Sequence, residues 1–261
     1  MNQGILVERG PVARITFNRP DQRNALRYED WSTLAMEVPR LAADSTVRVI
    51  VFTGAGDKAF SAGGDISQFP QWRMGVDQAR EYQKAVESAL QAIMDCPQPT
   101  VARINGACTG GGLQVATACD VRLAAAGARF GMPIARIGVV IGWRELERLV
   151  ELIGIGGASD LLLTGRLVDA QEAKAMGLVQ RVAAPDQLDQ LVEETIEALT
   201  AGSPYTHRVH KEMLALLPKH PGLQKLPAKA RELPLTAVNS MDYREGVAAF
   251  LEGRRPNFTG R

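Results

Sequence analysis

Two glycine-rich stretches carry the clearest chemical signal in this sequence. Gly110, Gly111 and Gly112 lie in NGACTGGGLQVATACD, between a strand-like run and an alanine-rich, helix-like run, and SAGGD places Gly63 and Gly64 after another apolar run. Glycine is unfavourable inside helices and strands, so these clusters indicate a close approach to the backbone. Backbone N–H groups from two such loops, one at a helix N-terminus, can converge to form an oxyanion hole.

A simple tight turn or a phosphate-binding loop would also contain such glycines. A single glycine-rich loop is commonly only a turn, so the oxyanion hypothesis depends on both loops together. TGGGLQ lacks the Lys and Ser/Thr of a P-loop, and GAGDKAFSAGG lacks the spacing of a dinucleotide fingerprint. Nucleotide triphosphate chemistry is therefore disfavoured.

Composition excludes several classes of protein. Lys+Arg 30 against Asp+Glu 29 gives a net charge of +1, which argues against a nucleic-acid binder. Three cysteines without paired spacing indicate a reducing compartment, and the three histidines form no metal-binding cluster, so we expect no metal. The N-terminus does not resemble a signal peptide and no apolar run is long enough for a membrane span. We expect a cytoplasmic protein that contacts neither membrane nor nucleic acid.

The elements that must position the glycines follow a recurring order of strand, glycine loop and helix. We expect a mixed α/β part followed by a mostly helical part from GWRELERLVELIG onward, with a helical C-terminal part from about residue 200. Helices are predicted over about Tyr28–Ala43 and Asp77–Cys96. Strands are predicted at ILVE, VARITF, VRVIVFTGAG and TVARING, and DVRLAAAGARFGMP is predicted to be one more strand and a loop.

Several longer blocks resemble the enoyl-CoA hydratase/isomerase (crotonase) family. They are FNRPDQRNAL, VIVFTGAGDKAFSAGGDI, PTVARINGACTGGGLQVATACDVRLAAAGARFG, TGRLVDAQEAKAMGLV and REGVAAFLEGRRPNF, in the order and spacing of that family. The resemblance implies a spiral of ββα units over residues 1–200 and a helical oligomerisation region over residues 201–261. It also implies a homotrimer or a hexamer built as a dimer of trimers.

The ligand that the resemblance implies is an acyl thioester of coenzyme A, with no separate cofactor. Gly64 and Gly111 match the two positions whose N–H groups hold the thioester oxygen, which favours an enolate. The implied contacts with the substrate and with CoA lie at Gln22, Arg23, Ala62, Gly64, Asp65, Ile66, Ser67, Gly111 and Ile134. Of these, Ala62 is expected near the adenine, Gln22 and Arg23 near the nucleotide end, and residues 64–67 along the CoA. Asp65 is also expected to cap the helix that follows it.

The sequence departs from the family at both usual catalytic glutamates. Gln114 occupies the position three residues after Gly111, and Ile134 follows the proline of FGMP. Neither side chain can take a proton from water. A later glutamate used by some isomerases corresponds to Gly142.

Few other side chains are available to replace these acids. Glu145 is a candidate, although an acid in a first helical turn is more simply explained by the helix dipole and a solvated face. Arg136 is interpreted as a surface arginine in preference to a partner for a substrate carboxylate. Tyr82 and Lys84 are interpreted as residues of a solvated helix in preference to a decarboxylase-like site, and Trp143 either lines the acyl pocket or fills the core.

Three functional classes remain from the sequence. The favoured one is a CoA-thioester lyase or isomerase, with weak ordinary hydration or a different reaction such as decarboxylation. The second is a protein that binds acyl-CoA without converting it, as the replacement of both glutamates suggests. The third, a purely structural protein, does not require two glycine loops.

Overall fold

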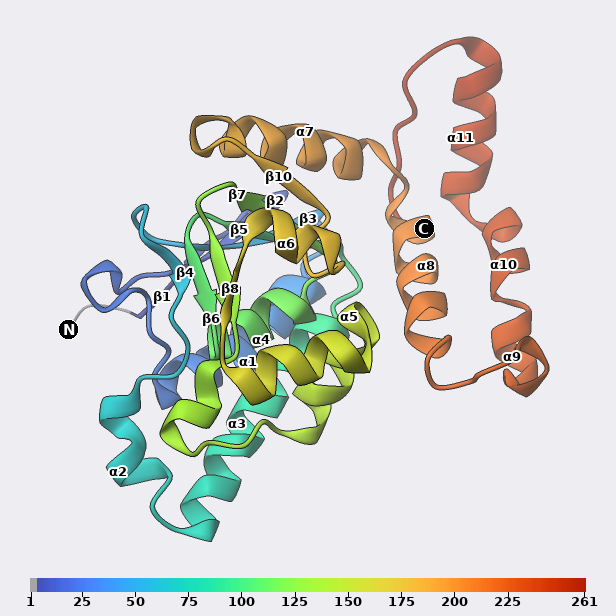
Figure 1. Ribbon diagram of the computed structural model, residues 1–261. Helices are drawn as coiled ribbons and strands as arrows, with labels where there is room; N and C mark the ends of the chain where they lie inside the picture. The colour runs from blue at the N-terminus through green and yellow to red at the C-terminus, as the bar shows by residue number, and fades with distance from the viewer. Residues whose placement is uncertain (1–3) are drawn as a thin grey trace.

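Two sheets stacked against helices form the body of the protein (Figure 1). The computed structural model describes residues 4–261. The larger sheet has the order β1 (Ile5–Glu8), β2 (Val12–Phe17), β3 (Val49–Gly54), β5 (Thr100–Ile104), β7 (Val121–Ala125), β10 (Arg181–Ala183). The smaller sheet has the order β4 (Ala59–Ser61), β6 (Ala107–Thr109), β8 (Arg129–Gly131), β9 (Leu167–Asp169).

Three consecutive units give the fold its spiral. Each unit contributes one strand to the larger sheet and one to the smaller sheet before a helix follows, as in β3–β4–α3, β5–β6–α4 and β7–β8–α5. The strands of successive units pair in parallel within each sheet. This is the predicted crotonase-like ββα arrangement. Because β4 and β6 are adjacent and parallel, the two glycine loops that follow them leave the same end of the smaller sheet.

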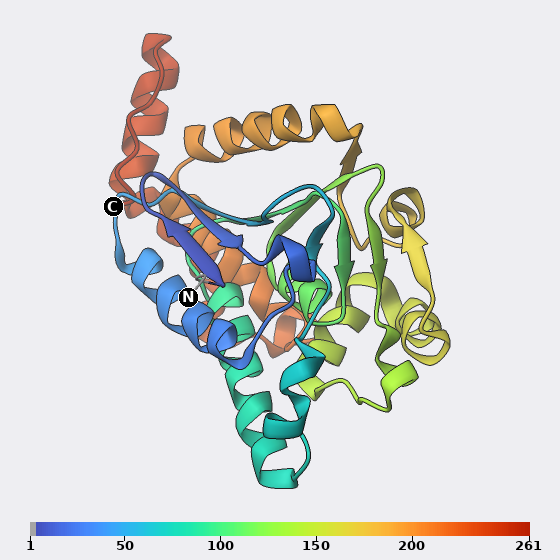
Figure 2. The same ribbon diagram turned by 90° about the vertical axis from the view of Figure 1, so that its left-hand side faces the viewer.

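The helices cover both faces of the larger sheet (Figure 2). On one face, Val49, Val51 and Val101 pack with residues of α7 (Leu188–Ala201). On the other face, alternate residues such as Ile50 and Phe52 belong to the main core, together with residues of six helices. These are α1 (Tyr28–Ala43), α2 (Phe69–Trp72), α3 (Val76–Met94), α4 (Gly111–Ala118), α5 (Trp143–Thr164) and α6 (Ala170–Ala175).

The sequence predicts the long elements well and the short ones poorly. The helix over Tyr28–Ala43 is confirmed, and the second long helix differs from its prediction by only one or two residues at each end. β4 lies in KAFSAGGDISQF, where the sequence predicts a loop, and β9 and β10 lie in the segment predicted as mostly helical. Strands of three residues are too short for an alternating pattern to be recognised.

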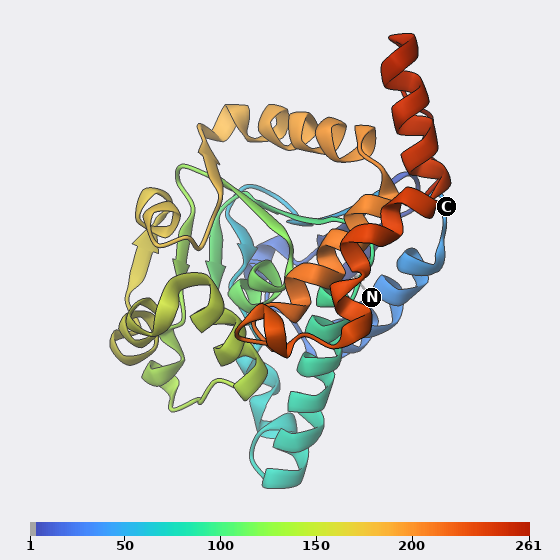
Figure 3. The same cartoon turned by 90° about the vertical axis from the view of Figure 1, so that its right-hand side faces the viewer.

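The C-terminal helices lie to one side of the sheets (Figure 1), and the last of them projects beyond the body of the protein (Figure 3). They are α8 (Pro204–Leu216), α9 (Ala228–Arg231), α10 (Leu233–Thr236) and α11 (Met241–Glu252). The outer helix α11 exposes large apolar side chains, with Phe250 86% and Leu251 78% exposed. Among the helices of residues 4–261, none has the length and apolarity needed to cross a membrane.

The segment that follows α11 is held against this helix by hydrogen bonds to Glu245. Arg254 donates hydrogen bonds of 2.6 and 3.0 Å to this carboxylate, and the N–H of Asn257 donates one of 2.7 Å. These bonds lower the pKa of Glu245 to about 2. The lowered pKa means that the tether is intact above the ordinary carboxyl pKa and is lost as the pH falls through the folded-state value.

We therefore expect the carboxyl carbon of Glu245 to titrate well below an ordinary glutamate when followed by NMR. The amide signal of Asn257 should move with the same midpoint, because its N–H loses its acceptor. Glu252→Gln removes the other carboxylate that pairs with Arg254. The signals of Glu245 and Asn257 should still titrate with the same midpoint in this variant. An ordinary midpoint in the unmodified protein would contradict the proposed tethering of the C-terminal turn.

Candidate active site

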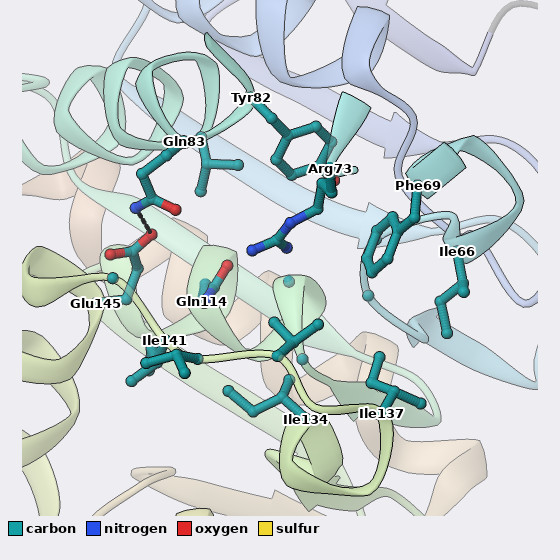
Figure 4. A pocket seen from close by; sticks show the side chains of 18 of the residues that line it. Ile66, Phe69, Arg73, Tyr82, Gln83, Gln114, Ile134, Ile137, Ile141 and Glu145 are labelled. Carbon is teal, nitrogen blue, oxygen red and sulfur yellow. Dashed lines mark hydrogen bonds between the residues drawn. The ribbon is translucent and has the colours of Figure 1, made fainter. Parts of the chain in front are cut away.

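A cavity of about 340 Å³ opens beside the two glycine loops (Figure 4). Its walls come from the loops after β4 and β6, from α2 and α3, and from the segment between β8 and α5. Among the residues predicted as site residues, Ala62, Gly64, Ile66, Gly111, Gln114, Ile134 and Glu145 line this cavity.

The two loops touch backbone to backbone, which explains the need for glycine. A Cβ on Gly63 would lie 3.0 Å from the nitrogen of Gly111, and a Cβ on Gly111 would lie 3.2 Å from the nitrogen of Gly64. Gly63 and Gly110 also have φ values of 103° and 50°, which residues other than glycine adopt rarely. Larger residues would push the loops apart.

The amide groups of Gly64 and Gly111 differ from those around them. The N–H groups of Gly63, Asp65 and Gly110 each donate to a protein acceptor, at 3.2, 2.7 and 3.1 Å. Within residues 4–261, no protein acceptor is bonded to the N–H of Gly64 or of Gly111. Two unused donors therefore belong to residues that line one cavity, and Gly111 is the first residue of α4, where the helix dipole adds positive potential.

An aromatic pair forms the wall behind these amides. The indole nitrogen of Trp31 donates a 3.2 Å hydrogen bond to the hydroxyl of Tyr82, and that hydroxyl lies 2.9 Å from the position of a Cβ on Gly64. Tyr82 is only 4% exposed, so its prediction as a residue of a solvated helix face is wrong. Burial raises the pKa of its hydroxyl, which keeps the group neutral. Lys84, two residues further along α3, is exposed as predicted.

Glu145 lies inside the cavity, which corrects its interpretation as an acid on a solvated face. It is 4% exposed, and its Oε1 accepts a 2.9 Å hydrogen bond from Nε2 of Gln83 on α3 (Figure 4). Its Oε2 is buried and has no hydrogen-bond partner in the described part of the chain. Because buried polar atoms are normally paired, this oxygen is available to a bound ligand.

The residue at which α5 begins explains why Glu145 is buried and Trp143 is exposed, the reverse of their predicted environments. The helix begins at Trp143, which is 86% exposed and so neither lines the cavity nor fills the core. Glu145, two residues later, faces the opposite side of the helix and points into the cavity. Gly142 leaves room for it, since a Cβ there would lie 2.3 Å from Oε2 of Glu145.

The remaining predicted contacts lie outside the cavity wall. Asp65 accepts hydrogen bonds from Ser67 and, at 3.2 Å, from Arg27, so its predicted capping role is confirmed. Its partial burial opposes ionisation, but these hydrogen bonds outweigh it and lower the pKa of the carboxyl. The carbonyl of Arg23 accepts a 2.9 Å bond from the N–H of Ala62, which brings the Gln22–Arg23 turn beside the first glycine loop.

Comparison with known proteins shows the family of the chain. The family model described as enoyl-CoA hydratase/isomerase matches residues 8–261. This chain belongs to the enoyl-CoA hydratase/isomerase family. A Bacillus subtilis protein of the enoyl-CoA hydratase/isomerase type is 35% identical, with 100% of both chains covered. The short-chain-enoyl-CoA hydratase of Clostridium acetobutylicum is 30% identical over 98% of this chain and 97% of its own.

Solved structures of the family share the whole fold. The crystal structure of an enoyl-CoA hydratase/carnithine racemase from Magnetospirillum magneticum superposes with a TM-score of 0.95 and 37% identity. The match covers 100% of this chain and 97% of that one. The fold expected from the resemblance is thereby confirmed, including its helical C-terminal part.

Four further side chains of this enoyl-CoA hydratase/isomerase fold belong to the cavity. Gln114 and Ile134 face it where the sequence suggests that catalytic glutamates are replaced. Arg136 is exposed and also contributes to the cavity rim. Arg73 lines the cavity too, and the sequence does not reveal it because a single arginine in a polar segment has no distinguishing spacing.

Proposed function

We propose that this protein converts acyl-CoA thioesters through an enolate, with the N–H groups of Gly64 and Gly111 holding the thioester oxygen and Glu145 transferring the proton. The observation that carries the proposal is the free Oε2 of Glu145 in the same cavity as the two unused amide donors. Converging donors stabilise negative charge that develops on a carbonyl oxygen. A buried carboxylate beside them supplies the base.

The reaction that suits one carboxylate is a double-bond shift. Glu145 takes a proton from the α-carbon of a 3-enoyl thioester, and the electron pair moves into the C–C–O system as the dienolate. The resulting carboxylic acid returns the proton to the γ-carbon, which gives the 2-enoyl thioester and restores the carboxylate. Net hydration would need additional acid–base help for water, and Gln114 and Ile134 cannot provide it. We therefore place isomerisation ahead of hydration.

The remaining parts of the proposal concern binding and assembly. We propose that the CoA moiety lies along residues 62–67 and the Gln22–Arg23 turn, and that no separate cofactor takes part. The exposed apolar side chains of α11 support residues 201–261 as the contact region of a homotrimer or of a dimer of trimers. We expect a cytoplasmic location.

The experiment that tests this proposal offers the protein two substrates. With 3-butenoyl-CoA, we expect the conjugated enoyl thioester absorbance to appear; with crotonyl-CoA, we expect its loss by hydration to be slow. Gln114→Glu/Ile134→Glu supplies the pair of acids that hydration uses and should raise crotonyl-CoA hydration. Fast hydration without isomerisation by the unmodified protein would contradict the assignment. Tight CoA-ester binding with neither reaction would identify a non-catalytic binding protein.

A further inference from the structure

Arg73 is a cation in the cavity whose guanidinium packs against two aromatic rings. It follows the short helix α2, and its guanidinium carbon lies 5.0 Å from the ring centre of Phe69 and 5.2 Å from that of Tyr82. The helix is anchored in turn by Tyr28 and Trp72, whose rings stack 3.8 Å apart. The guanidinium is therefore positioned before any ligand arrives.

The donors of Arg73 are unused by the protein. Within residues 4–261, its guanidinium has no ion pair and no hydrogen bond, although it is half-buried. By contrast, Arg80 on the neighbouring helix pairs with Asp77 at 2.6 Å on the surface. Partly buried charges are normally paired, so an unpaired one facing a cavity implies that the ligand supplies the anion.

The position of Arg73 indicates which part of the ligand it meets. Figure 4 shows its guanidinium projecting into the hollow between Gln114 and Phe69, on the side of the cavity that also holds Glu145. Arg73 stacks on the ring of Tyr82, and the hydroxyl of this tyrosine lies beside Gly64. A group bound by Arg73 is therefore close to the reacting carbons and belongs to the acyl chain.

We infer that Arg73 binds a carboxylate carried by the acyl group, so that the preferred substrates are CoA thioesters of dicarboxylic acids. The inference rests on the proposed function, because it assumes that the cavity holds an acyl-CoA. A planar guanidinium that is stacked on rings matches a carboxylate in two-point geometry and is weakly hydrated, which suits it to this role. The cavity contains two arginines, Arg73 and Arg136, and one acid, Glu145, so an anionic acyl group balances its charge.

The test is a set of calorimetric titrations with thioesters that differ in the terminal group. Succinyl-CoA, glutaryl-CoA and adipyl-CoA are each compared with the neutral acyl-CoA of the same length. We expect at least one dicarboxylyl thioester to bind about 10- to 100-fold more tightly than its neutral partner, the effect of one charge-assisted hydrogen-bonded pair. Arg73→Met should abolish this preference by weakening dicarboxylyl thioesters far more than neutral ones, while Arg73→Lys should keep part of it.

Two further variants separate Arg73 from other cations. Arg80→Met removes an exposed charge on α3 and should leave the preference intact, and Arg136→Met tests the cation at the rim. The inference is overturned if no dicarboxylyl thioester is preferred, if the preference survives Arg73→Met or follows Arg136, or if Arg73→Met weakens all CoA esters equally, as a CoA-phosphate contact would. Failure of every CoA ester to bind would instead overturn the proposed function itself.

Discussion

Glu145→Gln is expected to reduce turnover of a 3-enoyl-CoA about 10²- to 10⁴-fold, the usual contribution of a positioned acid–base group. Glutamine has nearly the same shape and can still accept the bond from Gln83, so folding and CoA-ester binding should be preserved. The loss should therefore appear in kcat and not in KM. Steady-state kinetics combined with calorimetric binding of a saturated acyl-CoA measures both.

Gln83→Leu is the matched control for the role of this carboxylate. It removes the only hydrogen bond that the carboxylate of Glu145 accepts within residues 4–261 but keeps the acid itself. We expect a smaller loss of kcat than in Glu145→Gln, because the acid remains in the cavity and only the bond that orients it is lost. Full activity in Glu145→Gln would show that another group moves the proton.

The second large effect is expected at Gly111, where proline removes the amide hydrogen. Gly111→Pro should reduce turnover about 10²- to 10³-fold, as the loss of one oxyanion donor does in other enzymes. Proline is tolerated at the first position of a helix, which is where Gly111 lies in α4. Comparing the turnover of Gly111→Pro with that of Gly111→Ala separates the loss of the N–H group from the effect of the added side-chain atoms.

Gly111→Ala is the correct reference because both variants carry a Cβ that would lie 2.9 Å from Cζ2 of Trp31. The shared contact should produce a similar loss of thermal stability in the two variants, whereas only alanine keeps the N–H. Equal activities of the alanine and proline variants would remove Gly111 from the proposed oxyanion hole.

The glycine loops can be recognised from the sequence because their signal is local. Gly63 and Gly111 stand where any side chain would collide with the neighbouring backbone, and such a constraint is visible as glycine itself. The convergence of the two loops depends on the parallel pairing of β4 and β6, which are three residues each and have no recognisable pattern. The family resemblance supplies that arrangement where the pattern cannot.

The side chains around the reacting carbons are harder to predict because their direction depends on packing. Tyr82 lies on a helix with many polar residues, which predicts a solvated face, yet its hydroxyl bonds to Trp31 in the interior. The charged neighbours of Glu145 predict exposure to solvent, and a shift of the helix start by one residue would reverse that prediction. The position of the Arg73 guanidinium depends on its stacking with Phe69 and Tyr82, which come from two different helices. No spacing in the sequence predicts this contact.

The most direct test of the proposed enolate site is exchange of the α-protons of a saturated acyl-CoA with D₂O. A saturated thioester can be neither isomerised nor hydrated, so deuterium at its α-carbon reports enolate formation alone. We expect mass spectrometry to find deuterium in butyryl-CoA or glutaryl-CoA incubated with the unmodified protein, and none above background with Glu145→Gln. Binding of both thioesters without exchange, or exchange that survives Glu145→Gln, would contradict the proposal that Glu145 and the two glycine amides form an enolate site.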